Sequence, residues 1–81
     1  MAWTVYMLEC ADTSLYTGIT VDLERRLDEH SKGKGAKYTK HRGPFTVVFN
    51  ERQETRGQAL KREAVIKAMT REEKLGLIKT G

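Results

Sequence analysis

A chain of 81 residues has room for one small hydrophobic core. Domains of this size bury only about 60–65% of the surface that their unfolded chains expose, so two domains would leave neither with a sufficient core. The hydrophobic share of 38% and the charged share of 32% are those of a folded globular protein. We therefore expect residues 1–81 to form a single domain that is ordered almost throughout.

Three apolar runs predict three β-strands. Residues 3–10 and 15–20 are rich in aromatic and aliphatic side chains, and residues 11–14 between them favour a turn, so a β-hairpin is expected. A third strand is predicted over residues 44–49, followed by a polar connection over residues 51–54.

A first helix is predicted between the second and third strands. It should begin near Asp22, with Leu23 and Leu27 on its inward face, and Gly33 and Gly35 should end it. Helices interrupted by glycine end readily because glycine adopts backbone conformations that other residues avoid.

Two capping boxes predict the remaining helices. Residues 55–58, Thr-Arg-Gly-Gln, have the spacing at which a threonine hydroxyl and a glutamine side chain bond the free backbone N–H groups of a helix start, so a helix is expected over residues 56–68. Residues 70–73 repeat this pattern and should start a short last helix. The side chains expected to face the core from it are Leu75, Leu77 and Ile78. The element order β-β-α-β-α-α predicts an α/β fold of the α+β kind, with a small three-stranded, mainly antiparallel sheet flanked by helices.

The distribution of charge favours a polyanionic partner. Fifteen Lys and Arg residues against eleven Asp and Glu residues give a net charge of +4 and a pI near 9.4. The segment from residue 32 to residue 42 contains no acidic residue, and we predict that it is a basic loop. Its positively charged residues are Lys32, Lys34, Lys37, Lys40 and Arg42.

The cysteine count and the hydropathy pattern favour the cytoplasm. Cys10 is the only cysteine, which excludes an intramolecular disulfide and a zinc site built from several cysteines. The sequence does not start with a charged head and a long apolar run, and no stretch approaches the roughly 20 apolar residues that span a membrane. We therefore predict a cytoplasmic protein with no membrane partner.

Two tyrosines lie on neighbouring strands of the predicted hairpin. A three-residue loop that pairs Cys10 with Ser14 would place Tyr6 opposite Gly18 and both phenol rings on one face of the sheet, whereas a two-residue loop would place the rings of Tyr6 and Tyr16 on opposite faces. Gly18 indicates that no side chain is wanted there, or that another group approaches the backbone closely.

A carboxylate lies on the helix predicted over residues 56–68. Leu60, Glu63, Ala64 and Lys67 share one stripe at helical spacing, and this stripe is predicted to face the core. A carboxylate against a core is unfavourable unless it is paired or binds a metal. Glu63 is therefore expected either to form a salt bridge, with Arg26 or Lys67, or to bind a cation.

The first helix carries two further candidates. Arg26 is either an ordinary cation of an amphipathic helix or a donor directed at a phosphate, and its neighbour Arg25 is expected to face solvent. His30 shares the face of Arg26 and can bond a phosphate, move a proton or cap the helix end. His41 is expected to be solvated.

Taken in order, these residues resemble the GIY-YIG nuclease superfamily. Val5-Tyr6-Met7 stands in the place of GIY and Tyr16-Thr17-Gly18 in the place of YIG, followed by a helical arginine ten residues after the second tyrosine and later by a helical glutamate. The segments at residues 15–20, 22–27, 35–39 and 63–67 are similar to the UPF0213 group of small bacterial proteins. The resemblance spans nearly the full chain and implies a GIY-YIG-like fold.

The resemblance implies a metal-dependent nuclease whose catalytic residues are Tyr6, Tyr16, Arg26, His30 and Glu63. Glu63 would hold one Mg²⁺ or Mn²⁺ together with water and phosphate oxygens, and no small-molecule cofactor is implied. Tyr6 would help to remove the proton of the attacking water, Tyr16 would orient that water, and Arg26 would neutralise charge on the phosphate. The two tyrosines could also exchange roles. Either one, with an ordinary pKa of about 10, needs nearby cations such as Arg26, Lys67 or the metal to lower that pKa.

The expected substrate is DNA, with RNA as the alternative nucleic acid. In the absence of an appended DNA-binding module, we expect an endonuclease or nickase that is structure-selective or weakly specific, with a role in DNA repair. The residues expected to contact nucleic acid are Lys32, Lys34, Lys37, Tyr38, Lys40, Arg42 and Lys67. Ile19 stands where some members of the superfamily carry lysine, which leaves open a non-catalytic nucleic-acid-binding module that acts with a partner. A third hypothesis is a small basic protein that assists ribonucleoprotein assembly.

Overall fold

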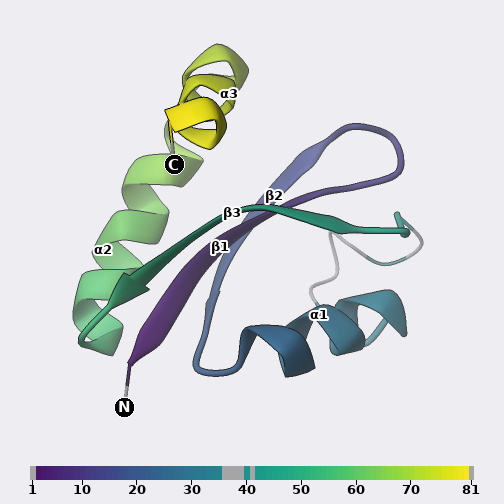
Figure 1. The fold of residues 1–81 in the computed structure, drawn as a ribbon, viewed down its shortest axis with the longest axis horizontal. Helices are drawn as coiled ribbons and strands as arrows, with labels where there is room; N and C mark the ends of the chain where they lie inside the picture. The colour runs from purple at the N-terminus through teal and green to yellow at the C-terminus, as the bar shows by residue number, and fades with distance from the viewer. Residues whose placement is uncertain (1, 36–39, 41, 81) are drawn as a thin grey trace.

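The computed structural model describes residues 2–35, 40 and 42–80. Within them the elements follow the predicted order β-β-α-β-α-α (Figure 1). Their bounds are β1 Trp3–Glu9, β2 Leu15–Thr20, α1 Leu23–Ser31, β3 Thr46–Gln53, α2 Arg56–Lys67 and α3 Arg71–Thr80. The α+β fold class that the sequence predicts is confirmed.

The three strands form an antiparallel sheet with β1 in the centre, in the order β2-β1-β3. The Cys10 N–H donates to the Ser14 carbonyl at 2.9 Å, which closes a three-residue loop between β1 and β2. Tyr6 consequently lies opposite Gly18, and Tyr16 lies opposite Leu8. Of the two predicted loop lengths, the longer one is therefore correct, and Tyr6 and Tyr16 occupy the same face of the sheet.

Strand β3 differs from its prediction at both ends. It begins at Thr46 because Pro44 has no N–H group with which to extend the ladder. It then continues to Gln53, through residues that were predicted to form a polar connection. Gln53 pairs with Trp3, so the backbone bonds offered by β1 outweigh the polar character of these side chains.

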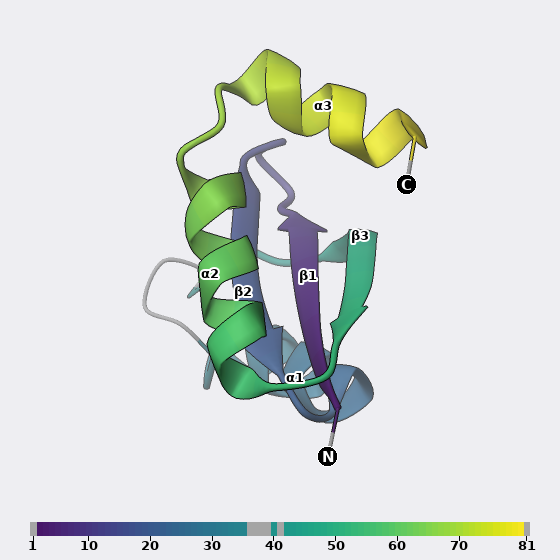
Figure 2. The same cartoon turned by 90° about the vertical axis from the view of Figure 1, so that its left-hand side faces the viewer.

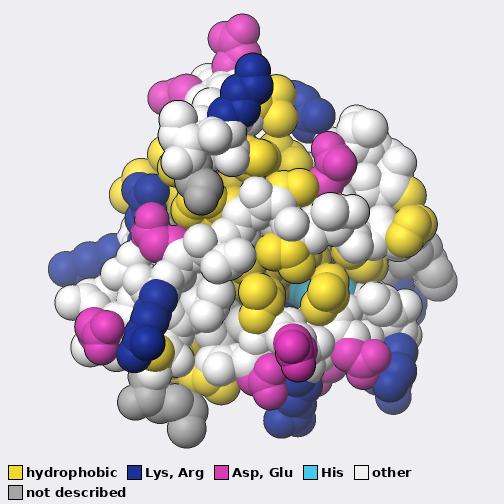
Figure 3. All heavy atoms as spheres, in the orientation of Figure 1, with side chains coloured by type: hydrophobic (Ala, Val, Ile, Leu, Met, Phe, Trp, Pro, Cys, Tyr) yellow, Lys and Arg dark blue, Asp and Glu magenta, His cyan; other side chains and the backbone are white. Residues whose placement is uncertain are grey.

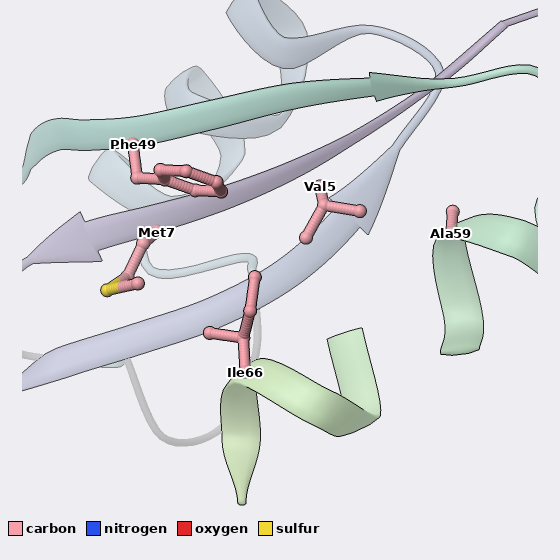
Figure 4. Close-up of a cluster of buried hydrophobic side chains, with 5 residues drawn as sticks. All are labelled: Val5, Met7, Phe49, Ala59 and Ile66. Atoms are coloured by element: carbon pink, nitrogen blue, oxygen red, sulfur yellow. The ribbon is translucent and has the colours of Figure 1, made fainter. Parts of the chain in front are cut away.

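The sheet separates two layers of helix (Figures 1 and 2). Helices α2 and α3 lie on one side and α1 on the other, next to the strand face that carries Tyr6 and Tyr16. The main hydrophobic cluster lies under α2 (Figure 4) and consists of Val5, Met7, Phe49, Ala59 and Ile66. A fully buried aliphatic side chain such as Ile66 contributes about 1.5–3 kcal/mol to stability.

The inward stripe of α2 is shifted by one position along the chain from the predicted stripe. Ala59 and Ile66 are fully buried, whereas Leu60 is 39% exposed and Lys67 is also exposed. Apolar side chains occur on several sides of this helix, so periodicity alone could not select the stripe, and packing against the sheet does. Of the predicted stripe, Glu63 alone remains partly buried, at the margin of the core.

Helix ends follow the predicted local chemistry. The Asp22 side chain accepts a hydrogen bond from the N–H of Arg25 at the start of α1, and Thr55 and Gln58 form the complete capping box of α2. Helix α1 ends before Gly33, whose φ of 73° lies in the left-handed region that glycine adopts most readily. Residues 70 and 73 form the second box, which starts α3.

Helix α3 only partly covers the core. Leu77 and Ile78 pack against the hydrophobic cluster as predicted, but Leu75 is 39% exposed. Charged side chains of both signs surround the face seen in Figure 3, and hydrophobic side chains gather towards its middle. Among the described residues, every helix is too short or too polar to cross a membrane.

Candidate active site

Tyr6 forms the buried floor of the candidate site. Its side chain crosses β2 above Gly18 and is only 1% exposed. A Cβ atom at position 18 would lie 2.6 Å from the Tyr6 Oη and 2.8 Å from its Cζ, distances that real Cβ atoms do not show. The prediction that no side chain is wanted at Gly18 is confirmed, and the group that approaches its backbone is the Tyr6 phenol.

Replacing Gly18 by Ala should therefore displace Tyr6. We expect the variant to lose about 1–3 kcal/mol of stability, the usual effect of overpacking a core, measured by urea denaturation. Gly76→Ala is the matched control, because a Cβ at this position in α3 meets nothing within 4 Å. It should instead stabilise the protein by about 0.5–1 kcal/mol through helix propensity. Equal stability of the two variants would contradict the tight packing of Tyr6 on Gly18.

His30 joins helix α1 to this floor. The residue is 1% exposed, and its Nε2 lies 2.9 Å from the Tyr6 Oη. Its ring meets Tyr16 edge-on at a centroid distance of 5.3 Å and Phe45 at 5.9 Å, while the two tyrosine rings lie 6.4 Å apart. His30 is therefore more than a helix cap, since it packs among the aromatic rings of the site.

Two residues of this packing were not identified from the sequence as parts of the site. Gly35 was assigned only to ending the helix, but a Cβ there would overlap the His30 Nδ1, so the Gly35 backbone also forms a wall of the histidine pocket. Phe45 was assigned to the third strand, but it precedes β3 and packs against His30. The available signal was a glycine five residues after a helical histidine.

Arg26 lies at the rim of the site. Its guanidinium lies close enough to the Tyr6 phenol to lower the pKa of Tyr6, it pairs with Glu29 at 3.3 Å, and its side chain is 30% exposed. Arg25 is 78% exposed, which confirms that it faces solvent. We assign the phenol proton of Tyr6 to its bond with the Nε2 of His30.

The electrostatics of Tyr6 correct one expectation. Burial raises the pKa of the Tyr6 phenol above 10.0, and the nearby Tyr16 and the negative charge of Glu63 act in the same direction. The guanidinium of Arg26 lowers the pKa of Tyr6, as expected from the sequence, but it does not overcome burial.

Burial also sets the protonation of His30. Desolvation, followed by the positive charge of Arg26, lowers the pKa of His30 below 6.5, and only Glu29 opposes the shift. His30 is therefore neutral at pH 7, and one ring nitrogen can accept a hydrogen bond.

This shift predicts a pH-dependent stability. Because the folded-state pKa of His30 is depressed, the unfolded chain binds the proton more tightly, so the contribution of His30 is fully present above pH 6.5 and is lost as pH falls through the folded-state pKa. We expect wild-type protein to lose more stability than His30→Gln between pH 7 and pH 5. Urea denaturation midpoints for both proteins across this range provide the measurement. Parallel curves would show that His30 does not titrate as described.

Glu63 reaches the site from the opposite layer. Its side chain is 18% exposed, and its carboxylate lies 3.4 Å from the Nζ of Lys67, so of the two predicted salt-bridge partners the structure pairs it with Lys67. The negative charge of Glu63 is close enough to raise the pKa of Tyr6. The Glu63 side chain is therefore only partly solvated.

The residues near Glu63 suit a sparsely ligated metal ion. The described residues contain no group of three or more His, Cys, Asp or Glu side chains that could form a metal cage. A single partly buried carboxylate fits Mg²⁺, which keeps several of its water ligands and accepts substrate phosphate oxygens. Glu63 already attracts a cation here, the ammonium of Lys67.

The residues predicted to contact nucleic acid differ in exposure and in whether they form ion pairs. Three have acidic partners: Lys32 pairs with Asp28, Arg42 with Asp12 and Lys67 with Glu63. Lys34 and Lys40 are exposed, while Lys37, Tyr38 and His41 lie outside the described residues. The acidic partners of the basic segment lie outside it: Asp28 is one helical turn before Lys32, and Asp12 lies in the loop between β1 and β2.

The chain is similar to members of one protein family over nearly its full length. The family model described as the GIY-YIG catalytic domain matches residues 2–75. UPF0213 proteins of Staphylococcus aureus, such as those of strains Mu50 and N315, are 52% identical over 75 residues, which cover 93% of this chain and 92% of each relative. The chain is also similar to two solution NMR structures, and in each case 99% of this chain aligns with 85% of the other. The UPF0213 protein of Bacillus halodurans is 42% identical with a TM-score of 0.65. A protein of E. faecalis is 43% identical with a TM-score of 0.69. This chain therefore belongs to the GIY-YIG catalytic domain family and, within it, to the UPF0213 proteins.

Proposed function

We propose that this protein hydrolyses phosphodiester bonds of DNA with the help of one divalent metal ion. The family is one of nucleases, and the observation that supports activity in this member is the convergence of Tyr6, His30 and Arg26, with Glu63 close enough to influence Tyr6. Phosphodiester hydrolysis by water requires three groups: a proton acceptor, a cation and a carboxylate that binds a metal ion.

In the proposed mechanism, His30 allows Tyr6 to act as a base without a lowered pKa. Tyr16, at the rim, orients the attacking water. The water gives its proton to the Tyr6 oxygen while Tyr6 gives its own proton to the neutral Nε2 of His30, at 2.9 Å. A free phenolate is therefore not required, and burial of His30 supports the transfer by keeping its imidazole neutral.

Arg26 and Glu63 act on the phosphate in this proposal. The guanidinium of Arg26, only partly exposed, neutralises the charge that builds on the phosphate oxygens. Glu63 would hold Mg²⁺ or Mn²⁺, and the bound ion would stabilise the leaving 3′ oxygen. We propose structure-selective or weakly specific cleavage, as an endonuclease or nickase in DNA repair.

The test is a cleavage assay with the purified protein. Linear, branched and single-stranded DNA, and a matched RNA, are incubated with Mg²⁺ or Mn²⁺ and, in parallel, with EDTA. We expect cleavage of DNA that EDTA abolishes and that a Glu63→Gln protein purified in the same way lacks. Identical products from wild type and Glu63→Gln would indicate a contaminating nuclease. Binding without any cleavage would favour the non-catalytic module, and tight binding of RNA alone would favour a role in ribonucleoprotein assembly.

A further inference from the structure

A pocket adjoins Tyr16 at the junction of β2, α2 and α3. It has a volume of about 440 Å³ and is lined by Leu15, Tyr16, Thr17, Lys67 and Lys74. Tyr16 belongs both to this pocket and to the aromatic cluster around His30, so the pocket is next to the candidate active site. Neither Thr17 nor Lys74 has a role in the proposed mechanism.

The positive charge in this pocket lacks a sufficient counter-charge. Lys74 is partly buried and forms no ion pair with any other described residue, while the ammonium of Lys67 has one carboxylate partner, Glu63. Two ammonium groups that line one pocket repel each other. A bound anion would relieve this repulsion.

Thr17 provides an independent indication of a ligand. It is 3% exposed, and its hydroxyl is the buried side-chain group that has no hydrogen-bond partner within the described structure. Buried hydroxyls are almost always bonded, so an orphan that lines a pocket points to a missing acceptor. Thr17 also lies on an edge strand. In the register set by the Cys10–Ser14 bond, its backbone N–H points away from β1, towards the open side of β2.

We propose that this pocket binds a backbone phosphate of the nucleic acid next to the phosphate that is cleaved. Lys74 and Lys67 supply the positive charge, and Thr17 donates hydrogen bonds to the phosphate oxygens. The inference rests on the proposed function, because it takes nucleic acid as the ligand. It adds a contact that would hold the strand in register relative to the catalytic residues.

The first test measures how DNA affinity depends on salt, with EDTA present so that no cleavage occurs. Loss of one phosphate contact lowers the slope of log K against log salt by about 0.7–0.9. We expect this decrease for Lys74→Ala but not for Lys79→Ala, the matched control, which removes an exposed lysine from the same helix. Equal slopes for the two variants would overturn the proposal.

The second test separates binding from folding at position 17. Thr17→Val keeps the shape of the side chain and removes the orphan hydroxyl, so we expect DNA affinity to fall about tenfold while the urea midpoint stays the same or rises. Thr46→Val, at an exposed position on β3, should change neither quantity. A Thr17→Val protein that is less stable but binds DNA normally would show a purely structural role.

A third measurement identifies the source of the phosphate. In NMR titrations, the Thr17 amide should shift with a short DNA strand at micromolar concentration and with inorganic pyrophosphate only at far higher concentration. The reverse order would overturn the nucleic-acid assignment in favour of a free phosphate compound. If the wild type cleaves DNA but Lys74→Ala and Lys79→Ala bind DNA equally well, the phosphate pocket is refuted and the nuclease proposal stands. If DNA binding depends on Lys74 but no protein cleaves DNA, the nuclease proposal is refuted and the pocket stands.

Discussion

Glu63→Gln should reduce the rate of DNA cleavage by at least about 100-fold while DNA binding in EDTA is retained. The change removes the carboxylate that is proposed to hold a divalent ion, and metal ions contribute several kcal/mol of transition-state stabilisation, each 1.36 kcal/mol being a factor of ten in rate. Stability should change by no more than about 1 kcal/mol, because the bond that is lost is with Lys67, which is 53% exposed. Single-turnover cleavage and calorimetric Mn²⁺ binding measure the two effects.

Glu72→Gln is the control for this prediction. Glu72 is exposed in the first turn of α3 and forms no ion pair with the described residues, so its removal tests the loss of one negative charge without a change in the site. It should cleave DNA and bind Mn²⁺ like the wild type. If Glu63→Gln did the same, Glu63 would not be the metal ligand.

Tyr6→Phe should lower the cleavage rate by about 10²–10⁴-fold, the range that positioned proton transfer contributes. The ring would remain packed over Gly18, so the fold should persist. The lost bond to His30 should reduce stability by about 0.5–1.5 kcal/mol. In the wild type the rate should fall as pH drops through the pKa of folded His30, which burial holds below 6.5, because protonated His30 can no longer accept the Tyr6 proton. The residual rate of Tyr6→Phe should lack this dependence.

Tyr16→Phe tests the alternative assignment of the base. It should slow the reaction less than Tyr6→Phe and keep the pH dependence, because Tyr16 is proposed to orient the water. A larger loss in Tyr16→Phe, together with a normal pH profile in Tyr6→Phe, would exchange the roles of the two tyrosines. Circular dichroism and urea denaturation of both variants exclude a folding defect as the cause.

The sequence alone predicted the features that depend on local chemistry. Capping by Asp22 and by the box at residues 55–58 requires only groups within one helical turn, and the need for glycine at position 18 was visible from its place in a strand. The order of elements and the family followed from such short segments. Each of these features depends on residues that are close together along the chain, and their spacing can be read directly from the sequence.

Only the tertiary structure decided which groups meet and in what dielectric. It closed a loop that places both tyrosines on one face, buried His30 against the Gly35 backbone and brought Asp12 to Arg42 of the basic segment. It also reversed the expected shift of the Tyr6 pKa, since burial outweighs the neighbouring Arg26. A side chain is buried by residues that are distant from it in the sequence. The free-energy cost of desolvating its charged form can exceed the gain from a neighbouring charge, so local sequence patterns could not predict these outcomes.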